Sequence, residues 1–275
     1  MKHLVLGSAG QIGGHLCKYL RDNNQEVITF DIRDHINEDL REIPNFHLHE
    51  CLKKCDFVHF LAFDVGGAKY LEKHQDTNQF ISNNMKIMSN TFEQIKNLNK
   101  PFIFASSQMS ELNHSSYGVL KLLGEKMTKD LGGTVVRFWN VYGQEPEGEH
   151  SHVITDLCKM AKYQKEIKVR TDGTEKRQFI HADDASKALV HIAGPWKNMK
   201  SPYGKEIDVT SGQWVSIKIL AGIIGEIAGL GTEDIYYSDK KDQTQKDAQN
   251  EAKNLFPLGL QYSLEEGIKL IYDKI

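Results

Sequence analysis

Near its start the chain runs from a short apolar stretch, residues 3–7, into a turn spaced by glycines. Gly7, Gly10 and Gly13 recur at every third position of GSAGQIG, and a helical pattern follows as far as Leu20. Residues without a Cβ atom let the backbone approach a pyrophosphate closely, and the first N–H groups of the following helix face that anion. The segment therefore predicts the strand, turn and helix that begin a dinucleotide-binding fold.

A second signal follows the next predicted strand, residues 26–30. Asp31 comes directly after it, 18 residues beyond Gly13, close to the separation of about 20 expected for an acidic residue that binds the adenosine ribose. A carboxylate there accepts hydrogen bonds from ribose hydroxyls and repels a 2′-phosphate, so Asp31 favours NAD over NADP as cofactor. Arg33 leaves the choice open, because its guanidinium is able to turn toward such a phosphate.

Predicted strands and helices alternate through the first half of the chain. Further strands are expected at 55–63, 101–107 and 134–143, and helices at 78–98 and 117–131. The strands are continuous apolar runs, as in parallel sheets that are covered on both faces. We therefore predict an α/β fold: a Rossmann-type doubly wound parallel sheet with a small C-terminal substrate-binding lobe.

The pattern loosens after Gly143, and this sets the expected domain boundaries. Residues 1–143 form the predicted NAD-binding domain, to which 179–195 return, and the substrate-binding lobe comprises 144–178 and 196–275. Within these ranges 144–151 is a predicted polar loop, 170–181 is strand-like, and 152–164, 183–193 and 216–229 are predicted helices. The polar stretch 239–254 is expected to be a solvated loop or helix face.

The overall charge and hydropathy exclude several classes of partner. The chain has 34 basic and 37 acidic residues and a net charge of -3, so no strong field attracts nucleic acid polymers or anionic membranes. No apolar run approaches the roughly 20 residues of a membrane-spanning helix. The apolar stretch near the N-terminus is too short for a signal peptide. We expect a cytoplasmic protein without nucleic acid or membrane partners.

A local group of histidines and cysteines raises the question of a metal site. His47, His49, Cys51 and Cys55 lie close together, but the C-x3-C spacing is not that of a zinc finger. We expect a surface strand that carries the two histidines on one face, followed by a polar loop, and no metal.

Tyr117 and Lys121 form the pattern Y-x-x-x-K and are expected on one face of a helix. A tyrosine with an ordinary pKa of about 10 must lose about 3 pKa units to act as a base near neutrality, which requires roughly 4 kcal/mol of phenolate stabilisation. A lysine cation one turn away and a positively charged nicotinamide ring supply charges of the required sign.

The chain resembles the extended short-chain dehydrogenase/reductases, specifically the NAD-dependent epimerase/dehydratase group that acts on nucleotide sugars. The resemblance rests on segments that span most of the chain: GSAGQIGGHL (7–16), FDIRD (30–34), CDFVHFLAF (55–63), ASS (105–107), YGVLK (117–121), VRFWNVYG (136–143), DGTEKRQFIHADDASKAL (172–189) and YSLEEGIK (262–269).

The resemblance implies roles for individual residues. The catalytic residues are Ser107, or less favourably Ser106, with Tyr117 and Lys121. The residues that contact NAD are Gly7, Gly10, Gln11, Ile12, Gly13, Asp31, Ile32, Arg33, Leu61 and Ala62, together with Tyr117 and Lys121. The residues that contact the nucleotide-sugar substrate are Gly66, Gly67, Ser107, Asn140 and Arg177, the last two at the diphosphate. His181 and Asp183 are expected to shape the domain junction.

Three departures from the family narrow the chemistry. The stretch 108–116 between Ser107 and Tyr117 is short, whereas relatives carry an insertion that lines the sugar pocket. Gln108 and Met109 replace the Asp-Glu pair of 4,6-dehydratases, and Met109 replaces the cysteine of the GDP-mannose 3,5-epimerases and GDP-fucose synthases, so neither side chain passes a proton. DVGG (64–67) nevertheless resembles the loop of the GDP-mannose 3,5-epimerases, a hint of a GDP-sugar.

What remains is hydride transfer at a sugar carbinol, by an epimerase or by a dehydrogenase/reductase. One alternative is an oxidoreductase that acts on another hydroxyl substrate. Another is a catalytically silent NAD-binding protein that serves as sensor or scaffold. A homodimer is expected, because the helices at 78–98 and 117–131 carry apolar residues on more than one face, such as Met85 with Met88 and Leu122 with Leu123. The corresponding helices of the family form a four-helix interface.

Overall fold

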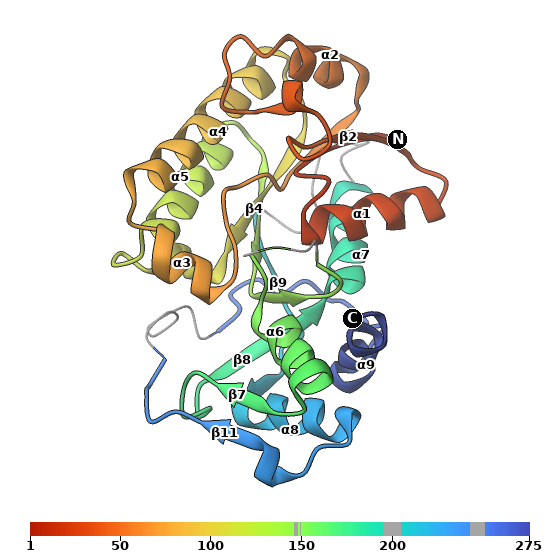
Figure 1. The fold of residues 1–275 in the computed structure, drawn as a ribbon. Helices are drawn as coiled ribbons and strands as arrows, with labels where there is room; N and C mark the ends of the chain where they lie inside the picture. Colours follow the sequence, from red (N-terminus) through yellow and green to blue (C-terminus); the bar gives the residue numbers. More distant parts are fainter. Residues whose placement is uncertain (146–147, 149, 195–204, 243–250) are drawn as a thin grey trace.

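The computed structural model describes residues 1–145, 148, 150–194, 205–242 and 251–275. Its centre is a six-stranded sheet in which all neighbouring strands are parallel (Figure 1). The strand order is β2 (Glu26–Phe30), β1 (Lys2–Leu6), β3 (Phe57–Phe60), β4 (Phe102–Ser107), β5 (Thr134–Phe138) and β9 (Glu206–Val209). The predicted α/β class and parallel sheet are confirmed.

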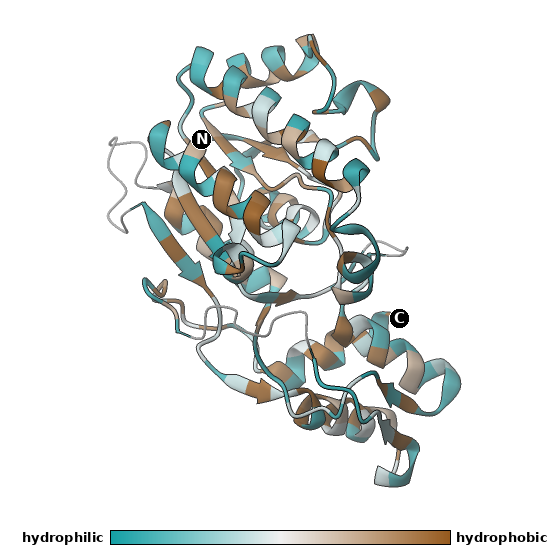
Figure 2. Cartoon of the chain, turned by 90° about the vertical axis from the view of Figure 1, so that its left-hand side faces the viewer, coloured by the Kyte–Doolittle hydropathy of each residue, from teal (hydrophilic) through white to brown (hydrophobic). Residues whose placement is uncertain are grey.

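Helices cover both faces of this sheet, as the continuous apolar strands require. One face packs against α2 (Phe46–Lys54), α3 (Ala68–His74), α4 (Asn78–Asn97) and α5 (Ser116–Asp130), and the other against α1 (Gln11–Asp22) and α7 (Ala182–Ala193). Alternate strand residues serve the two cores: Leu4 and Leu6 point to one, and Val5 to the other. Figure 2 shows apolar strands between helices with hydrophilic outer surfaces.

The strand order reverses beside β1, which fixes where a ligand binds. The chain leaves β1 to form β2 on one side and returns to place β3 on the other. In doubly wound sheets the crevice for a ligand lies at the carboxyl ends of the strands at such a reversal. Here the turn after β1 and the turn after β3 border that crevice.

A smaller lobe stands at this end of the sheet (Figure 1). It contains a three-stranded sheet of β10 (Trp214–Ser216), β8 (Lys176–His181) and β6 (Asn140–Tyr142), and a strand pair of β11 (Ile235–Tyr237) and β7 (Ile167–Val169). The helices of the lobe are α6 (Val153–Lys159), which continues as a wider turn over Met160–Gln164, α8 (Ile217–Ala228) and α9 (Leu264–Lys274). They enclose a separate apolar core. Short 3-10 turns occur at Ile36–Glu38, Gln108–Glu111 and Thr232–Asp234.

The division into sheet and lobe differs from the expected boundaries in three respects. The stretch 134–143 breaks after Phe138, so that β5 joins the main sheet and β6 joins the lobe. Residues 179–181 belong to β8 of the lobe, and the return to the main domain begins with α7, which packs on α1. β9 lies within 196–275 but extends the main sheet beside β5.

The segment around His47 is a helix, so the expected surface strand is wrong. The Asn45 side chain accepts a hydrogen bond from the Leu48 backbone and caps α2, and the buried side chains of Leu48, Cys51 and Leu52 recur at helical spacing against the core. The alternation of two histidines was a misleading signal, because the apolar period around them is helical. Residues 47 and 49 therefore point in different directions.

Two further observations concern the described residues only. They contain no group of three or more His, Cys, Asp or Glu side chains arranged to hold a metal ion. Within them, no helix combines the length and the apolar character that crossing a bilayer requires. Of the polar stretch 239–254, residues 243–250 lie outside the described ranges.

Candidate active site

A cavity of about 1050 Å³ lies between the carboxyl ends of the sheet strands and the lobe. It brings together every site residue that the sequence suggested. Its lining includes Gly7, Gly10, Gln11, Ile12, Gly13, Asp31, Ile32, Arg33, Leu61, Ala62, Gly66, Gly67, Ser107, Tyr117, Lys121, Asn140 and Arg177. Ser106 lines it as well, but its hydroxyl donates to the buried Glu125 carboxylate at 2.6 Å, whereas the Ser107 side chain contacts Tyr117.

The glycine turn has no space for side chains. Gly7 adopts a φ of 87°, and a Cβ atom there would lie 2.8 Å from the backbone nitrogen of Ala62. A Cβ on Gly13 would lie 2.0 Å from the Gly7 carbonyl oxygen. Gly10 caps α1 without a side-chain hydrogen bond, so the helix offers its first N–H groups to a ligand. These features fit a dinucleotide pyrophosphate.

Two carboxylates occupy the end of β2. Asp31 accepts hydrogen bonds from the backbone nitrogens of Ala9 at 3.0 Å and Arg33 at 2.9 Å. Glu38, which the sequence analysis missed, accepts from the Asp31 backbone at 2.6 Å and also lines the cavity. The Arg33 guanidinium turns back to donate to the Ala9 carbonyl at 3.3 Å. The negative charge expected at the ribose position is therefore present, and a second carboxylate reinforces it.

Ser107, Tyr117 and Lys121 meet where the end of β4 faces the first turns of α5. The Ser107 side chain hydrogen-bonds to Tyr117 and accepts from the Met109 backbone at 3.2 Å. The Lys121 ammonium donates to the Ala105 carbonyl at 2.8 Å. Strand and helix thus hold all three groups through contacts that do not depend on a ligand.

Burial shifts the pKa values of both Tyr117 and Lys121 away from their ordinary values. Burial raises the pKa of Tyr117 to about 12, although the Ser107 hydrogen bond acts in the opposite sense. Burial also lowers the pKa of Lys121 to about 7, against the attraction of Glu125. The protein alone therefore keeps the tyrosine protonated, because burial disfavours the phenolate more strongly than the Ser107 hydrogen bond favours it.

Phe63 is an additional site residue. Its ring centre lies 3.6 Å from the Lys121 ammonium, a cation–π contact, and the ring meets Tyr117 edge-on at 5.9 Å. Its position directly after Leu61 and Ala62 was the available sequence signal. Phe63 therefore packs against both Lys121 and Tyr117.

The lobe end of the cavity, called the basic end below, carries a cluster of cations, most of which are paired with carboxylates. Arg177 donates to the Asp242 carboxylate at 2.6 Å and to the Lys176 carbonyl at 2.7 Å. Further cations line the same region, namely Lys168, Arg170, Lys240 and Lys241. Such a cluster suits a diphosphate. Asn140, at the start of β6, also lines the cavity.

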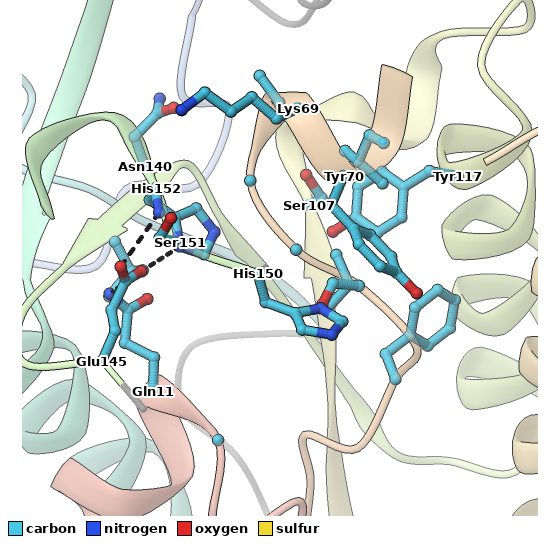
Figure 3. Close-up of a pocket in the computed structure, with 18 of the residues that line it drawn as sticks. Gln11, Lys69, Tyr70, Ser107, Tyr117, Asn140, Glu145, His150, Ser151 and His152 are labelled. Carbon is cyan, nitrogen blue, oxygen red and sulfur yellow. Dashed lines mark hydrogen bonds and ion pairs between the residues drawn. The ribbon is translucent and has the colours of Figure 1, made fainter. Parts of the chain in front are cut away.

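A polar network on the loop before α6 was missed by sequence reasoning. The buried Glu145 carboxylate binds the His152 ring, and Gln11 donates to it at 2.9 Å (Figure 3). Burial tends to raise the pKa of Glu145, but hydrogen bonds from His152 outweigh it and hold the pKa below its usual value. Gln11 begins α1, so this network ties the cofactor-binding helix to the lobe. In the sequence, the only sign of this network was the pair of histidines in EHSH (149–152).

Fold and site together define a Rossmann-type oxidoreductase with a dinucleotide crevice and a Tyr–Lys pair. The model of the NAD dependent epimerase/dehydratase family matches residues 3–203. The chain belongs to this family, and NAD is its cofactor.

Individual relatives are similar over 80% or more of the chain. GDP-L-fucose synthase of Escherichia coli (strain K12) is 25% identical, with 98% of this chain and 94% of the relative covered. GDP-mannose 3,5-epimerase 1 of Oryza sativa subsp. indica is 26% identical, with 80% and 67% covered. Among solved structures, the UDP-glucuronic acid 4-epimerase of Bacillus cereus, in complex with UDP-glucuronic acid and NAD, has a TM-score of 0.80 at 23% identity and 99% and 98% coverage. This structure has the same fold.

Proposed function

We propose that this protein is an NAD-dependent nucleotide-sugar epimerase or dehydrogenase/reductase that transfers hydride at a sugar carbinol carbon. The observation that carries the proposal is one cavity that joins the glycine turn, the Ser107–Tyr117–Lys121 group and the basic end around Arg177. These parts correspond to a dinucleotide, a reacting hydroxyl and a diphosphate.

Each catalytic side chain has a separate task. Ser107 holds the reacting hydroxyl beside Tyr117, and the Tyr117 phenolate removes the hydroxyl proton. Lys121 favours the phenolate and binds the nicotinamide ribose. Bound NAD supplies the hydride acceptor and a positive charge that opposes the raised pKa of Tyr117. Removal of the hydroxyl proton and loss of a hydride to NAD convert the carbinol to a ketone. Return of the hydride to the same face of the ketone gives the original alcohol, and return to the opposite face gives its epimer.

The residues after Ser107 support restriction to this chemistry. Gln108 and Met109 are both buried, and neither an amide nor a thioether exchanges a proton near neutral pH. Elimination of water or epimerisation at a carbon acid would require a proton-transferring group in these positions. The proposal is therefore confined to oxidation and reduction at the carbinol.

The substrate class follows from the basic end and from the relatives. Asn140 and Arg177 are assigned to the diphosphate, and Gly66 and Gly67 to the sugar. The names of the relatives include both GDP-sugar and UDP-sugar enzymes. GDP-sugars are the first candidates, because of the DVGG loop.

The test is turnover of a panel of GDP- and UDP-sugars, with NMR to detect an epimer and nicotinamide absorbance to detect net oxidation or reduction. Tyr117→Phe should lower turnover by about 10²–10⁴-fold with little change in NAD affinity. Lys121→Met should lower both the turnover and the affinity for NAD. Near-normal turnover by Tyr117→Phe would refute the catalytic assignment and favour the silent sensor or scaffold.

We also propose a homodimer through α4 and α5. Apolar side chains stay exposed on these helices: Met85 is 50% exposed, Val119 46% and Leu123 41%. Light scattering at micromolar concentration should give twice the monomer mass, and Leu123→Lys should shift the protein toward the monomer. A monomer mass for the unaltered protein would refute the dimer.

We also propose that the protein is cytoplasmic, and cell fractionation would test this location.

A further inference from the structure

Of the short stretch 108–116 between Ser107 and Tyr117, only Met109 lines the cavity. The stretch turns inward and packs on the start of α5. A Cβ atom on Gly118 would lie 2.3 Å from the Met109 carbonyl oxygen and 2.8 Å from that of Leu112. Met109 and Leu112 are themselves part of the main core. The wall of the sugar pocket must therefore come from another segment.

The loop 64–67 and the residues before α6 meet at this part of the cavity. His150 donates through Nδ1 to the Val65 carbonyl at 2.8 Å, and the Gly67 backbone donates to the His150 carbonyl at 3.1 Å. A Cβ on Gly67 would lie 2.1 Å from the Ser151 carbonyl oxygen, and one on Gly66 would lie 3.0 Å from the His150 Cα atom. The glycines thus serve close packing of two loops, which fixes the position of His150.

Tyr70 supports His150 from behind. The two rings pack at a tilt of 36° with centres 4.2 Å apart, and His74 packs on Tyr70 with centres 4.6 Å apart. Tyr70 donates to the Asp64 carboxylate at 2.6 Å, which in turn accepts from Asn83 of α4 at 3.0 Å. Tyr70 and His150 line the cavity, whereas His74 does not. The three rings form a column whose cavity end is His150.

The contact with Val65 sets the hydrogen-bonding character of His150. A carbonyl oxygen only accepts, so Nδ1 carries the proton, and in the neutral ring Nε2 is an acceptor. Among the described residues, none donates a hydrogen bond to Nε2. In Figure 3 His150 lies between the Glu145–His152 pair and the group of Tyr70, Ser107 and Tyr117. An acceptor at this place suits a hydroxyl group of a ligand.

We propose that His150, held in place by Tyr70, forms the wall of the sugar subsite and accepts a hydrogen bond from a sugar hydroxyl through Nε2. The inference rests on the proposed function and names a specificity-determining residue for it. His150 selects among sugars by the presence and orientation of that hydroxyl, and it takes no part in hydride transfer.

The test compares His150→Phe with His74→Phe. Both variants keep an aromatic ring against Tyr70, but only the first removes an acceptor from the cavity. His150→Phe should lower kcat/KM for the accepted nucleotide sugar about tenfold, while the affinities for NAD and for the sugar-free nucleoside diphosphate stay within about twofold. His74→Phe should leave all three quantities within about twofold.

Deoxy analogues of the accepted sugar add a test on the unaltered enzyme. If no deoxy analogue lowers its kcat/KM, the inference falls even when a variant folds poorly. Removal of one ring hydroxyl should cost the unaltered enzyme about tenfold in kcat/KM, and the same analogue should cost His150→Phe almost nothing. Equal losses in the two proteins, or an unchanged kcat/KM in His150→Phe, would overturn the inference with the proposed function intact. Failure of the unaltered enzyme to turn over any nucleotide sugar would instead overturn the proposed function, and the inference with it.

Discussion

Acidification should destabilise this protein through one buried histidine at the junction of sheet and lobe. His181 is 5% exposed and caps α7, where its Nδ1 accepts from the Asp183 backbone at 3.2 Å. Burial lowers the pKa of His181 to about 4, against the attraction of Asp183 and assisted by repulsion from His15 and Lys274. The rings of Tyr142 and Tyr262 also pack on it.

The sign and size follow from the two pKa values. The unfolded chain binds the proton near the ordinary histidine pKa of 6.5, and the folded protein near about 4. The neutral ring therefore contributes stability that is fully present above pH 6.5 and is lost as the pH falls toward 4. The complete loss corresponds to roughly 3 kcal/mol, and about 2 kcal/mol of it is reached by pH 5.

The assay is urea unfolding, followed by circular dichroism between pH 8 and 5, of the unaltered protein and of His181→Asn. Asparagine retains a side-chain acceptor for the helix cap but does not titrate. The unaltered protein should lose about 2 kcal/mol more than the variant over this range. The buried His59, whose pKa burial also lowers, is common to both proteins and cancels. Parallel losses in the two proteins would show that His181 is not the group responsible.

Two further predictions concern charges in the cavity. NAD should bind at least about tenfold more tightly than NADP, and Asp31→Ala should narrow the difference; equal dissociation constants for the unaltered protein would show that Arg33 governs the choice. Asp242→Asn should tighten the binding of GDP or UDP about fivefold, because a carboxylate no longer competes for Arg177. The matched Asp22→Asn, which breaks an ion pair with Lys18 outside the cavity, should change it little. If calorimetry gave the same change in affinity for both variants, the altered net charge, and not the release of Arg177, would explain the result.

The sequence was informative where function depends on short spacings. The glycine turn, Asp31 after its strand and the Tyr117–Lys121 pair each involve neighbours within one turn or one strand–helix unit, so their geometry follows from local structure. The parallel sheet was equally predictable, since strands buried on both faces leave a continuous apolar pattern.

What the sequence did not reveal depends on contacts between distant segments. Tyr70 meets His150, and Gln11 meets Glu145, only after the lobe folds against the sheet. The raised pKa of Tyr117 depends on how completely the core closes around it, which no spacing encodes. The strand predicted around His47 was wrong because two alternating polar residues outweighed a helical apolar period in the interpretation.

The path of the chain limits how this protein can be divided into fragments that fold independently. It passes from β5 to β6 across Trp139, returns from β8 to α7, and leaves the main sheet again after β9. It then revisits the sheet, where Leu255 pairs with Asp208, before ending in α9 of the lobe. Neither part is a contiguous stretch of sequence, so no single cut would release an independently folding half. To transfer the substrate preference of a relative by exchanging the lobe, recombination would have to join the two sequences at several junctions at once.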